Sequence, residues 1–217
     1  MALSKVDYNR LNVTAAASKA LKWNSGADGF ETGDVAGSLV LLETQTASSS
    51  ATISFTSNID STYKEYIFTF INMHPSANAD LTFQGSIDSG SNYNVAMTTT
   101  VVSPFHYEND TGGAALYYNA PKDQAQGTAF QSISSQVGSD ADQSVSGSLH
   151  LFNPASTTFV KHFICNVQTA CDDGSDPYQM QDLSAGYFNT TSAVDAIQFK
   201  MDSGNLDAGT FKLYGVT

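Results

Sequence analysis

Four histidines are the first residues to consider for catalysis or metal binding, because imidazole titrates near neutral pH and ligates transition metals. They are His74, His106, His150 and His162. No pair has the i, i+4 spacing of a zinc-protease helix, and none stands at motif spacing from a carboxylate. The G-x-S-x-G sequence that would mark a nucleophilic serine does not occur. We therefore expect packed or surface histidines and no enzyme active site.

A second candidate is the acidic run Asp172-Asp173-Gly-Ser-Asp176, whose alternating oxygen atoms could hold a calcium ion. An EF-hand loop would also need a glutamate at its twelfth position and flanking helices, and the sequence has neither. The glycine-rich patterns that bind phosphates and dinucleotides are missing as well. We expect a solvated acidic loop, with Asp172, Asp173 and Asp176 as weak metal ligands, and no cofactor.

Aromatic residues in or beside the expected loops are the best candidates for binding a polar ligand. A tyrosine ring has a flat apolar face and a hydroxyl, which suit stacking on and hydrogen bonding to a sugar. Tyrosine is also enriched in subunit interfaces, and we favour that interpretation while keeping glycan binding as the alternative. The possible ligand-binding residues are Tyr93, Tyr107 and Tyr178, within a set that also includes Phe105, Tyr117, Tyr118 and Tyr187.

The charge of the chain limits its partners. The formal net charge of the 217 residues is −12, so the protein should repel nucleic acids and anionic membranes. Only 14% of the residues are charged, and Ser, Thr, Asn, Gln and Gly fill most polar positions, as in twisted strands and tight turns. No apolar stretch approaches the roughly 20 residues of a membrane-spanning helix, and Met1–Lys22 lacks the apolar centre of a signal peptide.

The first part of the chain differs from the rest. Lys5, Arg10, Lys19 and Lys22 stand against a single acidic residue and give residues 1–22 a formal charge of +3, which leaves −15 downstream. Residues 1–37 lack strand alternation, with a short capped helix expected over residues 14–21 and turns over residues 24–29 and 32–37. We expect an irregular attachment arm over residues 1–37, which would bind its partner through these four basic residues and Trp23.

Residues 38–217 show short apolar runs separated by turn signals at intervals of roughly 8–12 residues, the rhythm of a sandwich or barrel. Several runs alternate strictly, which predicts strands with one buried and one wet face. The sequence therefore predicts an all-β, antiparallel, jelly-roll-like β-sandwich. The expected strands are Ser38–Glu43, Ala51–Ser57, Glu65–Met73, Asp80–Ile87, Val95–Val102, Ala114–Tyr118, Ala129–Val137, Ser144–Phe152, Thr158–Val167, Leu183–Phe188, Ala193–Met201 and Gly209–Tyr214.

Two of these strands, Glu65–Met73 and Thr158–Val167, carry apolar residues on both faces. Such strands lie in the centre of a covered sheet or pack against a second subunit. We therefore expect a homo-oligomer, with a trimer as the favoured state. The two cysteines, Cys165 and Cys171, are too few for a disulfide framework and lack zinc-site spacing, so we expect free thiols.

Three stretches carry a resemblance to a known group of proteins. Residues 51–75, residues 147–154 and residues 196–216, the last of which contains a strand closing on Leu-Tyr-Gly, resemble virion structural proteins of marine tailed bacteriophages. The resemblance covers most of residues 38–217. It implies a protein of the decoration or fibre type, assembled in the reducing cytoplasm of the host and displayed on the virion.

Together these observations predict a non-enzymatic structural protein of a tailed-phage virion. It would be an exposed head-decoration or knob protein or a short fibre. Its N-terminal arm would anchor it to other virion proteins of the capsid or tail. The alternative is a tail-fibre or receptor-binding protein whose β-sandwich binds a host surface glycan. A polysaccharide hydrolase ranks third, because no catalytic constellation supports it.

Overall fold

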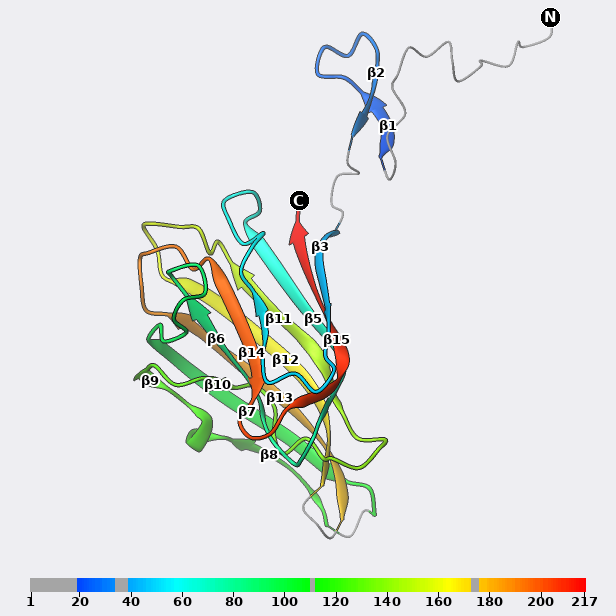
Figure 1. Ribbon diagram of the computed structural model, residues 1–217, viewed down its shortest axis with the longest axis vertical. Coiled ribbons are helices and arrows are strands. Elements are labelled where there is room, and N and C mark those ends of the chain that lie inside the picture. Colours follow the sequence, from blue (N-terminus) through cyan, green and yellow to red (C-terminus); the bar gives the residue numbers. More distant parts are fainter. Residues whose placement is uncertain (1–18, 34–38, 110–111, 173–175) are drawn as a thin grey trace, which may run out of the picture. The chain divides into compact units, whose positions relative to one another are not determined.

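The computed structural model describes residues 19–33, 39–109, 112–172 and 176–217 (Figure 1). The chain divides into two compact units, one within residues 1–39 together with Thr217 and the other over residues 40–216. We call them the N-terminal unit and the body and describe each by itself. The expected arm residues Lys5 and Arg10, with most of the expected helix over residues 14–21, lie outside the described residues.

The described part of the N-terminal unit is a β-hairpin of β1 (Ala20–Trp23) and β2 (Phe30–Gly33). Its turn is closed by two backbone hydrogen bonds, from Asn24 N to Gly29 O and from Ala27 N to Asn24 O, both 3.0 Å. The structure thus differs from the expected irregular arm over residues 20–33. The reason is that two strands of four residues are too short to produce a readable alternation.

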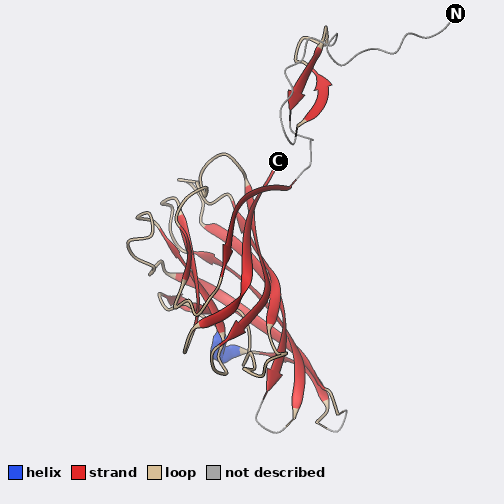
Figure 2. Cartoon of the chain, turned by 45° about the vertical axis from the view of Figure 1, so that its right-hand side comes forward, coloured by secondary structure: helices blue, strands red, loops and turns tan. Residues whose placement is uncertain are grey.

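The body is an all-β antiparallel sandwich, as the sequence predicts. One sheet has the order β10-β6-β14-β4, and the other has the order β3-β15-β5-β11-β12-β13-β7-β8, with β9 paired to β7 (Figures 1 and 2). The strands are β3 (Leu39–Thr46), β4 (Ile53–Phe55), β5 (Glu65–Pro75), β6 (Leu81–Ser86), β7 (Met97–Tyr107), β8 (Ala114–Tyr118), β9 (Ala125–Gly127), β10 (Gln131–Ser132), β11 (Val145–Phe152), β12 (Lys161–Asp172), β13 (Pro177–Phe188), β14 (Ala196–Met201) and β15 (Leu206–Val216).

Phenylalanine rings from both sheets meet in the space between them. Phe199 of β14 lies 4.8 Å from Phe211 of β15 and 5.6 Å from Phe68 of β5, between ring centroids. Every ring in this group is fully buried. Burial alternates along the first part of β5, because successive side chains point to opposite faces, whereas all six residues of β6 are buried. We call the group the aromatic core: Phe55, Phe68, Phe70, Phe83, Phe199 and Phe211.

The expected strands differ from the observed ones near β7, β9, β10 and β13. β7 continues to Tyr107, five residues past the expected Val102, and β9 was not expected. Most of the run expected over residues 129–137 is loop, since only Gln131–Ser132 forms a strand. β13 begins at Pro177, six residues before the expected Leu183, and β12 continues to Asp172. These strand ends carry polar residues such as Gln168 and Gln181, so the sequence there offers little contrast with a loop.

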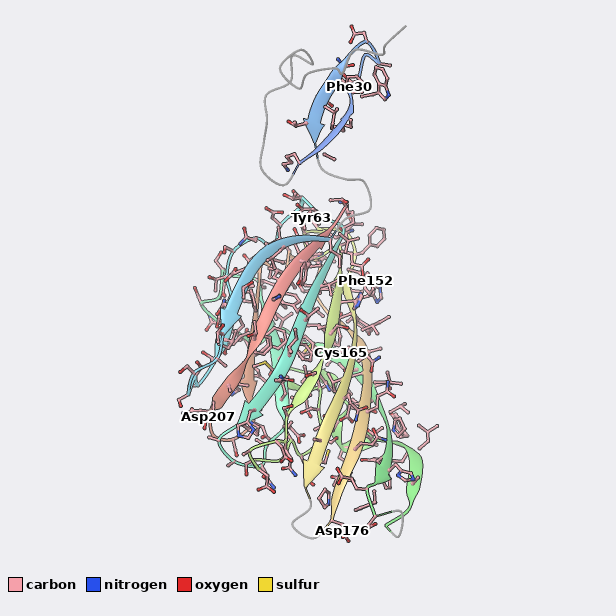
Figure 3. The ribbon with its side chains drawn as sticks, turned by 90° about the vertical axis from the view of Figure 1, so that its right-hand side faces the viewer. Phe30, Tyr63, Phe152, Cys165, Asp176 and Asp207 are labelled. Carbon is pink, nitrogen blue, oxygen red and sulfur yellow. The ribbon has the colours of Figure 1, made fainter. Side chains whose placement is uncertain are left out.

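The two doubly apolar strands, β5 and β12, both lie inside the large sheet, whose outer face is turned to the viewer in Figure 3. One face of each contributes to the buried core, through residues such as Phe68 and Phe163. On the other face, Ile71 is 46% exposed and Ile164 is 52% exposed. Within the described chain, therefore, only one face of each strand is covered.

Candidate functional site

A hollow of about 790 Å³ opens where one end of the large sheet meets the loops of the small sheet, and we call it the polar pocket. Strands of the large sheet supply one wall, formed by Tyr117, Tyr178 and Met180. The facing wall comes from loops next to the small sheet and contains Asn78, Ala79, Asp80, Gln136, Asp202 and Ser203; Asn119, Lys122 and Ser135 complete the lining.

Strand periodicity decides which side chains reach the pocket. In β8, Tyr117 lines the pocket and pairs across the sheet with Ser103, while the next residue, Tyr118, turns to the opposite face. In β13, Tyr178 and Met180 alternate with exposed neighbours and lie on the buried face together with Asp182. The same alternation therefore places two pocket residues and one carboxylate side by side.

Lys122 is fixed by three oxygen acceptors. Its Nζ donates to Asp80 Oδ2 at 2.5 Å, to Ser132 Oγ at 2.9 Å and to the carbonyl oxygen of Ser134. Lys122 ends the short 3₁₀-helix Ala120–Lys122, whereas Asp80 immediately precedes β6. The contact ties the 3₁₀-helix to the small sheet, and it neutralises the ammonium group within the pocket.

Behind the pocket lies a buried group of hydrogen-bonded polar side chains, which we call the Asp182 network: Ser103, Asn119, Ser135 and Asp182. Asp182 Oδ1 accepts hydrogen bonds from Ser103 Oγ at 2.5 Å and from Ser135 Oγ at 3.1 Å. Asn119 Nδ2 donates to Ser103 Oγ at 3.2 Å and to the Tyr117 hydroxyl at 3.4 Å, which links the network to the pocket wall.

Asp182 is only 1% exposed, and its Oδ2 has no hydrogen-bond partner among the described residues. Removal from water raises the pKa of this carboxyl, although hydrogen bonds from Ser103 and Ser135 oppose the rise. Among the described residues, Ser103 and Asp182 form hydrogen bonds with one another, with Asn119 and with Ser135, and none of these partners is a histidine.

The predicted ligand-binding tyrosines separate into two groups. Tyr107 and Tyr178 lie together, with ring centroids 5.0 Å apart, and Tyr178 lines the polar pocket. Tyr93 lies beside the Gly90 turn between β6 and β7 and is not part of the pocket. Asp182 and Lys122 escaped the sequence analysis. For Asp182, the only signal was its place in the alternation Tyr178, Met180, Asp182, which required β13 to begin early.

The acidic run has no metal-site geometry in the part of the chain that the structure describes, where no three metal-ligating side chains come together. Asp176 accepts a hydrogen bond from Asn109 Nδ2 at 2.8 Å. Asp173 and the side chain of Asp172 lie outside the described residues.

In the N-terminal unit, the described candidates are Lys19, Lys22 and Trp23. Lys22 forms an exposed ion pair of 3.5 Å with Glu31 across the hairpin. Trp23 is 61% exposed and stacks on Phe30 at 4.4 Å between ring centroids. The hairpin therefore presents a stacked aromatic pair next to a lysine.

Cys165 and Cys171 are free and buried, which confirms the predicted thiols. Desolvation raises the pKa of both thiols, and it raises that of Cys171 to about 12. Because the thiolate is the reactive form, neither cysteine is suited to act as a nucleophile at neutral pH.

Three of the four histidines contact neighbouring groups. His150 Nδ1 lies 2.7 Å from Glu65 Oε1, and His74 Nδ1 lies 2.8 Å from Gln143 O. The ring of His162 lies 6.0 Å from that of Tyr187, between centroids. These contacts agree with the predicted packed or surface histidines.

The face of the large sheet that turns away from the small sheet carries a group of apolar side chains on neighbouring strands. Ile164 of β12 pairs with Ala185 of β13, and both line a shallow hollow of about 430 Å³. We call the surrounding surface the outer apolar face: Ile67, Ile71, Phe152, Ile164, Leu183 and Tyr187.

The described residues contain no helix long and apolar enough to span a membrane. Comparisons of the chain with known protein families, with curated proteins and with solved structures found no match.

Proposed function

We propose that this chain is a non-enzymatic structural protein of a tailed-phage virion, displayed as a head-decoration or knob protein or as a short fibre. In this proposal it assembles in the host cytoplasm, and residues 1–37 attach it to other virion proteins of the capsid or tail. The observation that carries the proposal is a separate N-terminal unit, with the positive charge concentrated in residues 1–22, ahead of an acidic all-β body.

The charge difference supports attachment through the N-terminal unit. Residues 1–22 carry a formal charge of +3 while the remainder carries −15, so an acidic patch on a partner would attract one end and repel the other. Trp23 and Phe30 offer an exposed stacked pair beside Lys22. Tryptophan and aromatic neighbours of this kind are common anchors of protein interfaces.

The order of the strands supports a jelly roll enlarged by two insertions. In a jelly roll, eight strands form two four-stranded sheets through Greek-key connections. The orders β3-β15-β5-β11 and β4-β14-β6-β10 fit that scheme, with β7 to β9 and the pair β12 and β13 as insertions that widen one sheet. Jelly rolls build viral capsid proteins and lectins, so the topology favours the proposal by analogy of fold.

The outer apolar face supports the proposed homo-oligomer, for which a trimer is the favoured state. Its exposed isoleucines lie on central strands, and a second copy would remove them from water. Polar and charged groups lie among these residues, since Ile67 and Ile164 both pair with His150, which contacts Glu65. The apolar side chains would form the centre of such a contact.

The proposal is tested by mixing purified chain, with and without residues 1–37, with undecorated phage heads and separately with tails, followed by sedimentation. Binding of the full chain to heads, lost on truncation, is the expected result. Binding to tails alone favours the fibre form of the proposal. Failure to bind any particle overturns it.

A second candidate function is a tail-fibre or receptor-binding protein whose sandwich binds a host surface glycan. The observation that favours it is the polar pocket, in which tyrosines face amide, hydroxyl and carboxylate groups. The two functions are compatible in one protein, since the attachment residues and the pocket belong to different units.

A further inference from the structure

We infer that the polar pocket binds an uncharged saccharide, with Tyr117 as the aromatic platform and polar groups of the facing loops as hydrogen-bond partners. The inference rests on the second candidate function and names its site and ligand class. The volume of about 790 Å³ falls within the roughly 300–1,000 Å³ of small-molecule sites.

The charges of the pocket argue against an ionic ligand. Its basic residue, Lys122, already contacts Asp80, Ser132 and the Ser134 carbonyl, so its charge is compensated. Asp202 adds a further negative charge, which would repel a phosphate or sulfate group. A divalent cation would need a set of oxygen ligands, and no group of three carboxylate or histidine side chains exists among the described residues.

The two walls match the two sides of a sugar ring. A pyranose carries C–H groups that pack on an aromatic face and hydroxyls that need donors and acceptors. Tyr117 and Met180 provide apolar surface on one wall. On the facing wall, Asn78 Oδ1 accepts a hydrogen bond from Ser139 N and Asp202 Oδ1 accepts one from Asp80 N. The side-chain Nδ2 of Asn78 and Oδ2 of Asp202 are therefore the atoms that could bind a ligand.

The pocket is held in place before any ligand arrives. Asn119 is fixed between Tyr117 and Ser103, and Lys122 is fixed by its three acceptors. Gln136, on the facing wall, has a left-handed backbone φ of 41° and donates its N–H to Asp80 Oδ1 at 2.7 Å. A non-glycine residue in that conformation carries strain, and such residues concentrate at binding sites. A preformed site of this kind loses less entropy on binding.

Neighbouring tyrosines offer a matched pair of variants. Tyr117 lines the pocket, whereas Tyr118 points to the opposite face of the same edge strand and donates to Asp123. The variants Tyr117→Ala and Tyr118→Ala remove the same side chain from adjacent positions. Asn78→Ala, on an exposed loop, removes a proposed hydrogen-bond partner from the facing wall.

The test is binding of the labelled full chain to an array of neutral, sialylated and sulfated glycans, followed by calorimetric titration with the strongest neutral glycan. We expect neutral glycans to bind, at least tenfold weaker binding by Tyr117→Ala and Asn78→Ala, and binding within twofold of the parent by Tyr118→Ala. Thermal unfolding of each variant shows whether the fold is intact.

Absence of binding to every neutral glycan overturns the inference, as does preference for the acidic glycans or an equal loss in the two tyrosine variants. Sedimentation of Tyr117→Ala with heads and tails separates this result from the attachment proposal. That variant should sediment as the parent does, so failure of the pocket and failure of the arm give different outcomes.

Discussion

The aromatic core and the Asp182 network are both buried, yet they are built from opposite chemistry. Phe199 and its neighbours need no specific partner geometry, because burying apolar surface is favourable in itself. Burying the Asp182 carboxylate costs free energy. Hydrogen bonds from two serines offset part of this cost at Oδ1, whereas Oδ2 has no hydrogen-bond partner among the described residues. The comparison predicts that the aromatic core contributes more to stability than the Asp182 network does.

The difference follows from the unequal size of the two sheets. The small sheet has four strands and the large sheet has nine, so the small sheet cannot cover the whole inner face of the large one. Near β13 and β8, loops such as residues 133–137 take its place, and loops bring backbone and side-chain polar groups with them. A polar, hollowed region therefore forms where the second sheet ends.

The largest expected effect is loss of stability from the aromatic core. Phe199→Ala should lower the free energy of unfolding by about 3–5 kcal/mol, because it removes a ring that packs against Phe68 and Phe211. Urea unfolding followed by circular dichroism measures the change. Phe159→Ala, at a 67% exposed position, is the control and should change it by less than about 0.5 kcal/mol. Equal effects would contradict the comparison.

A smaller loss of stability is expected when the contact between Lys122 and Asp80 in the polar pocket is removed. Lys122→Met leaves the largely buried Asp80 without its counter-charge and should cost about 1–3 kcal/mol in urea unfolding. Lys22→Met, which breaks the exposed pair with Glu31, should cost less than about 1 kcal/mol. If the two variants lower the free energy of unfolding equally, the contact between Lys122 and Asp80 does not stabilise the pocket.

Asp182 should make stability depend on pH. Its folded pKa is raised above the unfolded value, so the folded state favours the protonated carboxyl. Stability from this group is therefore greatest below the unfolded pKa of about 3.8 and declines as the pH rises through the folded pKa. Asp182→Asn should remove that decline. Urea unfolding of both proteins between pH 4 and pH 8 tests this, and parallel curves would be the opposing result.

The smallest change in monomer stability is expected on the outer apolar face. Ile164→Asp should alter the free energy of unfolding by less than about 0.5 kcal/mol, since the side chain is half exposed. It should nevertheless lower the mass of the particle seen by light scattering at micromolar concentration, because a charge would be buried in the proposed interface. A parent chain that is strictly monomeric under the same conditions would count against oligomerisation through this face.

Local patterns were enough to predict the sandwich. The alternation of Ile197, Phe199 and Met201 indicates a strand with one buried face whatever lies opposite, because the period of two is a property of the backbone. The turn at residues 24–29 and the free thiols were also predictable from residue type and number. The hairpin of residues 20–33 was not, since its strands are too short to show a period.

The polar pocket depended on the tertiary structure. Tyr178 was a candidate from its residue type, but its neighbours come from two distant segments, Asp80 next to β6 and Tyr117 with Lys122 in the stretch from β8 to the 3₁₀-helix. Asp182 became recognisable only when β13 proved to begin at Pro177 and to place that carboxylate on a buried face. The pattern of side chains along the chain is sufficient to predict which residues alternate in a strand. Which strands lie side by side, and where the smaller sheet ends, depends on pairing between residues far apart in the chain, because every strand offers the same backbone donors and acceptors.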